Sequence, residues 1–121
     1  MPNNTRLRQA SPRRGEIWTA HLGDSRERHW VLVVSLDQRN SSENAQTVLI
    51  VPFSSRIADA PTTITLQPGE TGLPGPSCLR GHFITTLPKM DLIERQPRSL
   101  SGLRMRQVCA AIRRSFDPEA G

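Results

Sequence analysis

Only one stretch of this sequence has the apolar periodicity of an α-helix, and it lies at the C-terminal end. Within residues 100–116 the apolar stripe consists of Met105, Val108, Cys109, Ile112 and Phe116. This spacing places the five side chains on one side of a helix, and Ser101 is a suitable N-cap residue. The preceding sequence consists of short runs, so most of the fold must be built from β-strands.

Five of these runs predict strands, because they alternate in polarity or are rich in β-branched residues. They are residues 15–22, 30–36, 46–53, 62–66 and 77–81. Residues 83–94 predict a short strand or a turn, interrupted by Pro88. Polar segments rich in turn-forming residues separate the runs. The sequence therefore predicts a mainly β fold, a small and strongly bent antiparallel sheet or open barrel closed by the C-terminal helix.

The length of 121 residues suits one domain. We expect residues 1–13 to form a flexible basic arm and residues 14–117 to form the domain. The N-terminal segment lacks the apolar region of a secretory signal, and no apolar run is long enough to cross a membrane. We therefore expect a cytoplasmic protein that does not associate with a membrane.

The chain has 16 basic and 11 acidic residues, a net charge of +5, and all the basic residues but Lys89 are arginine. Arginine suits phosphate groups, so a polyanion such as nucleic acid is a natural partner, although a GC-rich genome also favours arginine. Cys78 and Cys109 lie in apolar surroundings and predict free, buried thiols rather than a disulfide. Histidine and cysteine do not cluster, and phosphate-binding or nucleophile motifs are missing, so we expect neither a metal nor a cofactor.

Polar side chains gather where predicted strands begin and end. Arg26, Arg28 and His29 precede the second strand, and Ser54, Ser55 and Arg56 follow the third. Arg80 and His82 stand two apart at the end of the fifth, where continued alternation gives them a common face. Each has an ordinary alternative: a solvated histidine, a salt-bridged arginine, a serine in a turn. Trp18 and Trp30 suit the core, although Trp30 is also able to stack on a base.

The order of these segments resembles the PemK/MazF toxins of bacterial toxin–antitoxin modules. The resemblance rests on RRGEIW at the start of the domain, then VLVVS, LIVPFSS, TGL, LRGHFITTLPK and LSGLRMRQVCAAI, over residues 13–116. It implies an SH3-like small barrel with a C-terminal helix, working as a homodimer. It also implies an antitoxin partner with an acidic, disordered segment that folds over the basic toxin.

Active members of that family are endoribonucleases that cut single-stranded RNA without a metal. The 2′-OH attacks the adjacent phosphate and leaves a 2′,3′-cyclic phosphate and a 5′-OH. Such chemistry needs a base, an acid and a cation near the phosphate. A non-enzymatic toxin that acts on DNA gyrase, as the similar CcdB toxins do, and a catalytically inactive RNA-binding relative are alternatives.

Carried over position by position, the family's Arg-Pro before the second strand falls on His29 and Trp30, with Arg28 one place earlier. Its Thr-Ser pair falls on Ser54 and Ser55. Arg80 matches an arginine of some members, and His82 stands where many have an acid. The resemblance thus implies a catalytic set consisting of Arg28, His29, Ser54, Arg80 and His82.

In this hypothesis Arg80 stabilises the phosphate and Ser54 donates to it. His82 or His29 acts as general base or acid. The residues that would hold the RNA are Arg26, Trp30, Ser55 and Arg56.

Overall fold

Strand β3 (Thr47–Ser54) organises the sheet in this computed structural model, which describes residues 11–121. One edge of β3 pairs with β2 (Arg28–Val33), and the other pairs with β6 (Thr85–Pro88) and then with β5 (Ser77–Arg80). The main path through the antiparallel sheet is β4-β5-β3-β2-β1-β7. The remaining strands are β1 (Glu16–His21), β4 (Thr63–Leu66) and β7 (Leu92–Ser99).

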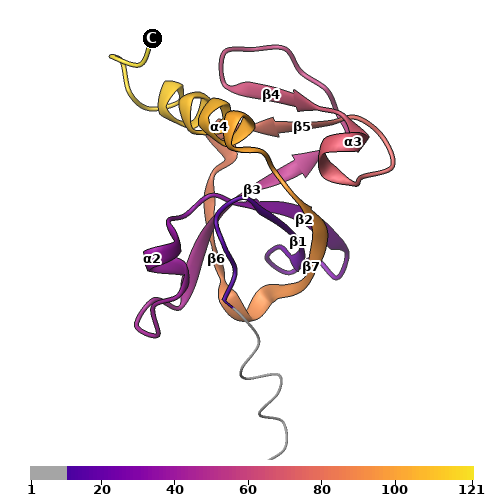
Figure 1. Ribbon diagram of the computed structural model, residues 1–121, viewed down its shortest axis with the longest axis vertical. Helices are drawn as coiled ribbons and strands as arrows, with labels where there is room; N and C mark the ends of the chain where they lie inside the picture. Colours follow the sequence, from indigo (N-terminus) through magenta and orange to yellow (C-terminus); the bar gives the residue numbers. More distant parts are fainter. Residues whose placement is uncertain (1–10) are drawn as a thin grey trace, which may run out of the picture.

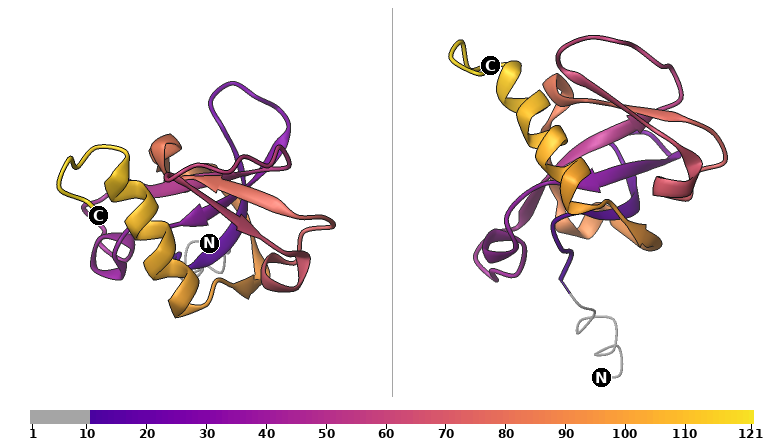
Figure 2. Two further views of the ribbon diagram at one scale, coloured as in Figure 1. Left: turned by 90° about the horizontal axis from the view of Figure 1, so that it is seen from above. Right: turned by 45° about the horizontal axis from the view of Figure 1, so that its top comes forward.

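Four short helical segments connect the strands, and one longer helix follows them. They are α2 (Asp37–Asn40), α3 (Pro68–Thr71), the 3₁₀ turns η1 (Gly81–Phe83) and η2 (Lys89–Asp91), and α4 (Gly102–Arg114). Figures 1 and 2 show α4 beside β4 and β5. No helix in residues 11–121 is long and apolar enough to span a membrane.

Both faces of β2 are buried, which explains its continuous apolar sequence. Val31 and Val33 pack into a cluster with Trp18 and Ile50. Leu32 belongs to a second cluster, on the side that receives α4. Because successive strand residues point to opposite faces, one strand contributes to both cores. The two cores hold β2 and β3 rigidly between them.

The predicted mainly antiparallel fold with a C-terminal helix is confirmed, and so are the five strands. The prediction for residues 83–94 was incomplete: they contain the whole of β6 and η2 and the start of β7. The free thiols are confirmed, but only Cys78 is fully buried. The predicted arm, residues 1–13, falls almost wholly outside the described residues.

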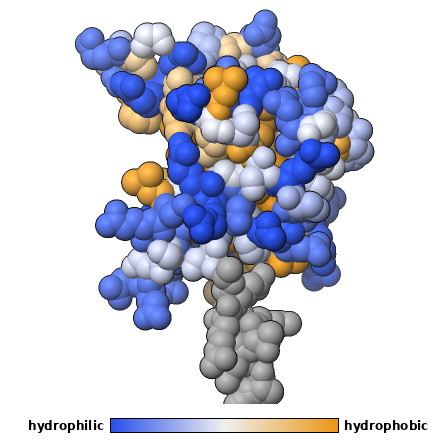
Figure 3. All heavy atoms as spheres, viewed as in Figure 1, coloured by the Kyte–Doolittle hydropathy of each residue, from blue (hydrophilic) through white to orange (hydrophobic). Residues whose placement is uncertain are grey.

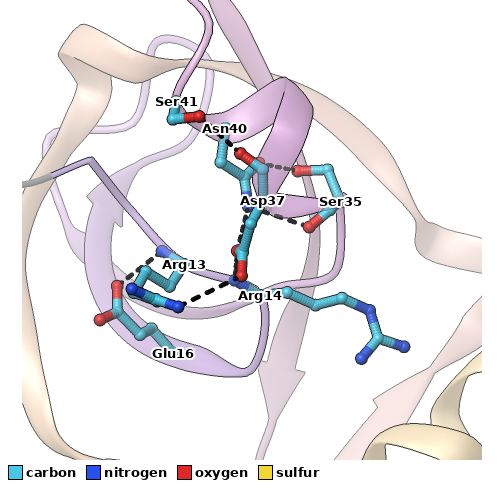
Figure 4. Close-up of polar contacts among 7 residues, drawn as sticks. All are labelled: Arg13, Arg14, Glu16, Ser35, Asp37, Asn40 and Ser41. Atoms are coloured by element: carbon cyan, nitrogen blue, oxygen red, sulfur yellow. Dashed lines mark hydrogen bonds and ion pairs between the residues drawn. The ribbon is translucent and has the colours of Figure 1, made fainter.

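Polar contacts tie the segment before β1 to α2 (Figure 4). The carboxylate of Asp37 accepts the backbone N–H of Arg14 at 2.6 Å and lies 3.7 Å from the Arg13 guanidinium. Buried Asn40 accepts the Ser35 hydroxyl proton and donates to the Ser35 carbonyl at 2.9 Å. The short helix therefore satisfies buried polar groups while it anchors the entry to the sheet.

Gly81 allows helix α4 to approach the sheet closely. A Cβ atom at this position would lie 2.7 Å from the backbone carbon of Ala111 and 2.7 Å from the nitrogen of Ile112. Such distances are well inside van der Waals contact, so only glycine fits without a shift of the helix. This packing explains the glycine of the RGH sequence.

A second link joins α4 to α3. The Arg104 guanidinium donates to the Glu70 carboxylate at 2.7 Å, and Glu70 also accepts the backbone N–H of Gln67 as part of a capping box. The Arg104 hydrogen bond, followed by that of Gln67, lowers the pKa of Glu70. The same pairing raises the pKa of Arg104.

We expect Gly81→Ala to lower the free energy of unfolding by about 1–3 kcal/mol, because the added methyl group forces α4 away from the sheet. Urea unfolding measures the change. Gly69→Ala is the matched control, since a Cβ there meets nothing within 4 Å. Equal stability of the two variants would contradict the packing argument.

We expect Arg104→Met to lose about 1 kcal/mol of stability at pH 7. The pKa of Glu70 is lower in the folded state, so its contribution is present above the usual carboxyl pKa near 4.5. It is lost as the pH falls through the folded-state pKa. Urea unfolding from pH 7 to pH 3 should therefore show the variant and the wild type converging in acid.

Arg106→Met serves as the control for Arg104→Met, because Arg106 makes no salt bridge among residues 11–121. A gap between Arg104→Met and wild type that stays constant down to pH 3 would rule out the ionised Glu70 pair as its cause.

Candidate active site

A pocket of about 260 Å³ lies where β2 begins and β3 ends. The loop of residues 73–76, which leads into β5, closes another side of it. Five residues predicted from the sequence line this pocket: Arg28, His29, Trp30, Ser54 and Ser55. The antiparallel pairing of Val31 with Pro52 explains this convergence, because it brings the start of one strand beside the end of its neighbour.

Strand alternation divides the lining residues into two sets. Trp30 and Phe53 pack against the core beneath α4 and therefore share that face of the sheet. His29 and Ser54, one position away on each strand, belong to the opposite face. The pocket thus spans the ends of the strands and has an aromatic part and a part with an imidazole and a hydroxyl.

His29 is half-buried and held by the loop before β2. Its Nε2 atom lies 3.2 Å from the Ser25 hydroxyl, which also accepts the backbone N–H of Glu27 at 3.2 Å. An imidazole fixed in this way is able to accept or donate a proton at the pocket. The contact with Ser25 restricts the orientation of the ring.

Ser54 accepts a hydrogen bond within a local turn, and its hydroxyl is still able to donate one to a substrate. Its Oγ accepts the backbone N–H of Arg56 at 3.1 Å, so the expectation of a turn residue is met. Accepting that bond leaves the hydroxyl proton free to be donated. Ser55 and Arg56 are exposed beyond the strand, as is Arg26 in the loop before β2. Arg26 and Arg56 do not line the pocket.

Arg80 and His82 do not share a strand face, which corrects the sequence prediction. β5 ends at Arg80, and His82 lies in η1, because Gly81 turns the chain where it packs on α4. The Nδ1 atom of His82 is 3.0 Å from the Thr62 hydroxyl, and its ring centroid is 4.5 Å from that of Phe83. His82 is exposed and lies outside the pocket.

Arg80 also lies outside the pocket lining but stays close to the end of β3. Its guanidinium donates to the carbonyl of Arg56 at 2.9 Å and stands 5.9 Å from the centre of the Phe83 ring. Ser54 pairs with Cys78, so Arg80 is one diagonal step from Ser54 on the same face. Arg80 makes no salt bridge within residues 11–121.

Sequence reasoning missed the wall formed by residues 73–76, and Phe53 and Ser77 with it. The sequence LPGP indicates a turn-rich connection, and nothing in it says which strand ends it covers. Two prolines restrict the backbone of this loop.

A larger hollow of about 570 Å³ between β4 and α4 contains Arg104, Arg106 and Arg114. It contains none of the predicted catalytic residues. Within residues 11–121, no group of three histidine, cysteine or acidic side chains is placed to hold a metal ion.

Comparison with protein families places residues 13–116 within the model described as "PemK-like, MazF-like toxin of type II toxin-antitoxin system". A curated relative is the probable endoribonuclease MazF5 of Mycobacterium tuberculosis. It is 26% identical over 108 residues, which cover 89% of this chain and 95% of the relative.

Solved structures share the fold at low sequence identity. A mycobacterial endoribonuclease in complex with its cognate antitoxin matches with a TM-score of 0.72 and 23% identity, over 87% of this chain and 94% of its own. The Mycobacterium tuberculosis toxin MazF-mt6 matches with a TM-score of 0.72 and 20% identity, over 84% of this chain and 96% of its own. A chain of a MazE–MazF crystal structure from Deinococcus radiodurans matches with a TM-score of 0.70 and 17% identity, over 88% of this chain and 95% of its own. The fold is therefore MazF-like.

Proposed function

The chain belongs to the PemK-like, MazF-like toxins of type II toxin–antitoxin systems and is homologous to MazF endoribonucleases, and from this premise we propose how it cleaves RNA. The substrate is single-stranded RNA in the cytoplasm. A 2′-OH attacks the adjacent phosphate, the bond to the 5′-oxygen breaks, and the products carry a 2′,3′-cyclic phosphate and a 5′-OH. This reaction needs no metal.

The observation that carries the proposal is the meeting of His29 and Ser54 in one pocket with a cation, Arg28, at its edge. The imidazole takes the proton of the attacking 2′-OH or gives one to the leaving 5′-oxygen. Ser54 donates its free hydroxyl proton to a phosphate oxygen. Arg28 and Arg80 supply positive charge where negative charge develops.

The remaining arginines and an aromatic ring hold the RNA. Arg26 and Arg56 are exposed in the loops next to the two strand ends, where they attract the phosphate backbone. Trp30 is half-buried in the pocket and offers a surface for stacking. His82 has no role in this scheme, because it lies in η1 outside the pocket.

The protein's partners are a second copy of the chain and an antitoxin. The face seen in Figure 3 is mostly hydrophilic with separate apolar spots. The exposed apolar side chains of α4 and of the segment after it include Leu103 and Phe116. These side chains support a homodimer. The net charge of +5 supports an antitoxin with an acidic segment, in line with the relatives crystallised with antitoxins.

We expect the purified protein to cleave a mixed single-stranded RNA in the presence of EDTA. End analysis should find a 2′,3′-cyclic phosphate on one side of each cut and a 5′-OH on the other. Cleavage that requires a divalent cation, or products with a 5′-phosphate, would exclude this reaction. RNA that is bound and never cut would indicate an inactive relative.

We expect His29→Ala to lower kcat about 10²–10⁴-fold, because a positioned acid or base is lost. Single-turnover cleavage of one RNA measures it. His21→Ala is the matched control, since His21 is exposed at the end of β1, pairs with Arg28 and does not itself line the pocket. If His82→Ala showed the large loss and His29→Ala did not, the acid–base role would belong to η1.

A further inference from the structure

Ser77 is the exception among the buried polar side chains of residues 11–121. It is 3% exposed, and its Oγ atom has no hydrogen-bond partner within those residues. Buried Ser35 and Asn40 bond to each other, and Thr71 accepts the backbone N–H of Leu73 at 3.0 Å. A buried hydroxyl without a partner costs stability, so a position that keeps one calls for an explanation.

The position of Ser77 connects this hydroxyl with the candidate active site. Ser77 is the first residue of β5 and lines the pocket. Alternation places its side chain on the same face as that of Leu79, which lies in the core cluster against which Trp30 and Phe53 pack. The unpartnered hydroxyl therefore belongs to the aromatic part of the pocket, away from His29 and Ser54.

The chemistry of this part suits a flat ring with a polar edge. Its walls are Trp30, Phe53 and the proline-restricted loop of residues 73–76, and the hydroxyl of Ser77 is deeply placed. A phosphate would favour the exposed cation at the edge, Arg28. The volume of about 260 Å³ is below the range of about 300–1,000 Å³ typical of pockets for drug-sized ligands. A single base is of suitable size.

We propose that the aromatic part of the pocket holds one nucleobase of the RNA and that Ser77 Oγ hydrogen-bonds the polar edge of that base, which makes Ser77 a specificity-determining residue. The proposal rests on the proposed cleavage of RNA. The hydroxyl left unpaired in the free protein gains its partner only when the preferred base is bound. A site with a buried polar group discriminates against bases that leave it unpaired.

The test is Ser77→Ala, assayed for cleavage of an RNA library and for thermal unfolding. Removing an unpartnered hydroxyl should leave Tm unchanged or higher. Cleavage at the preferred sequence should fall about three- to tenfold, the worth of one hydrogen bond, and selectivity should relax at a single base position. Ser77→Cys, which keeps the size of the side chain, should show the same relaxation if the alanine variant folds poorly.

Cys78→Ala is the matched control, because Cys78 is the next residue on β5, is fully buried and does not line the pocket. It should lower Tm and leave the base preference unchanged. Wild-type selectivity and rate in both Ser77 variants would overturn the proposal while cleavage itself stands.

If the wild type does not cleave RNA, the proposed function fails. The base site is then tested separately, by measuring the affinity of the protein for RNA. The probes are RNA oligonucleotides with 2′-O-methyl groups throughout, which differ at one base. Loss of base discrimination in Ser77→Ala supports the base site. Identical affinities of wild type and variant for every oligonucleotide overturn it.

Discussion

The pairing of β2 with β3, with apolar side chains on both faces, is the constraint on which the site depends. Val31 and Val33 fill one core while Leu32 fills the other, so neither strand is able to shift its register without exposing a core. The fixed register brings the start of β2 to the end of β3. His29 and Ser54 therefore meet at a rigid scaffold although they are 25 positions apart in the sequence.

The strands with strong apolar patterns were predictable from the sequence, and those without them were not. β7 carries the polar sequence ERQPRS and is mostly exposed, so its partner β1 determines its structure through backbone hydrogen bonds. Pro97 falls where the register between β1 and β7 shifts, a position at which a proline removes no regular pairing. Such a strand depends on tertiary contacts that no local pattern records.

The candidate site was predictable to the extent that strand ends determine it. Arg28, His29 and Ser54 could be identified because they flank two buried strands. The separation of Arg80 from His82 could not, because it depends on the backbone of α4 lying against Gly81, a contact between residues about 30 positions apart. The position of residues 73–76 could not be predicted for the same reason, because their composition predicts a turn but not which strand ends the turn covers.

The two faces of the sheet at the ends of β2 and β3 correspond to the two parts of the proposed function, catalysis and recognition of a base. Acid–base chemistry needs groups that exchange protons with the substrate, and the proposed reaction draws them from the face with His29 and Ser54. Recognition of a base needs a dry surface and few polar groups, and the proposed base site uses the face with Trp30, Phe53 and Ser77. In the proposed reaction the permanent cations are Arg28 and Arg80, one on each face of the sheet.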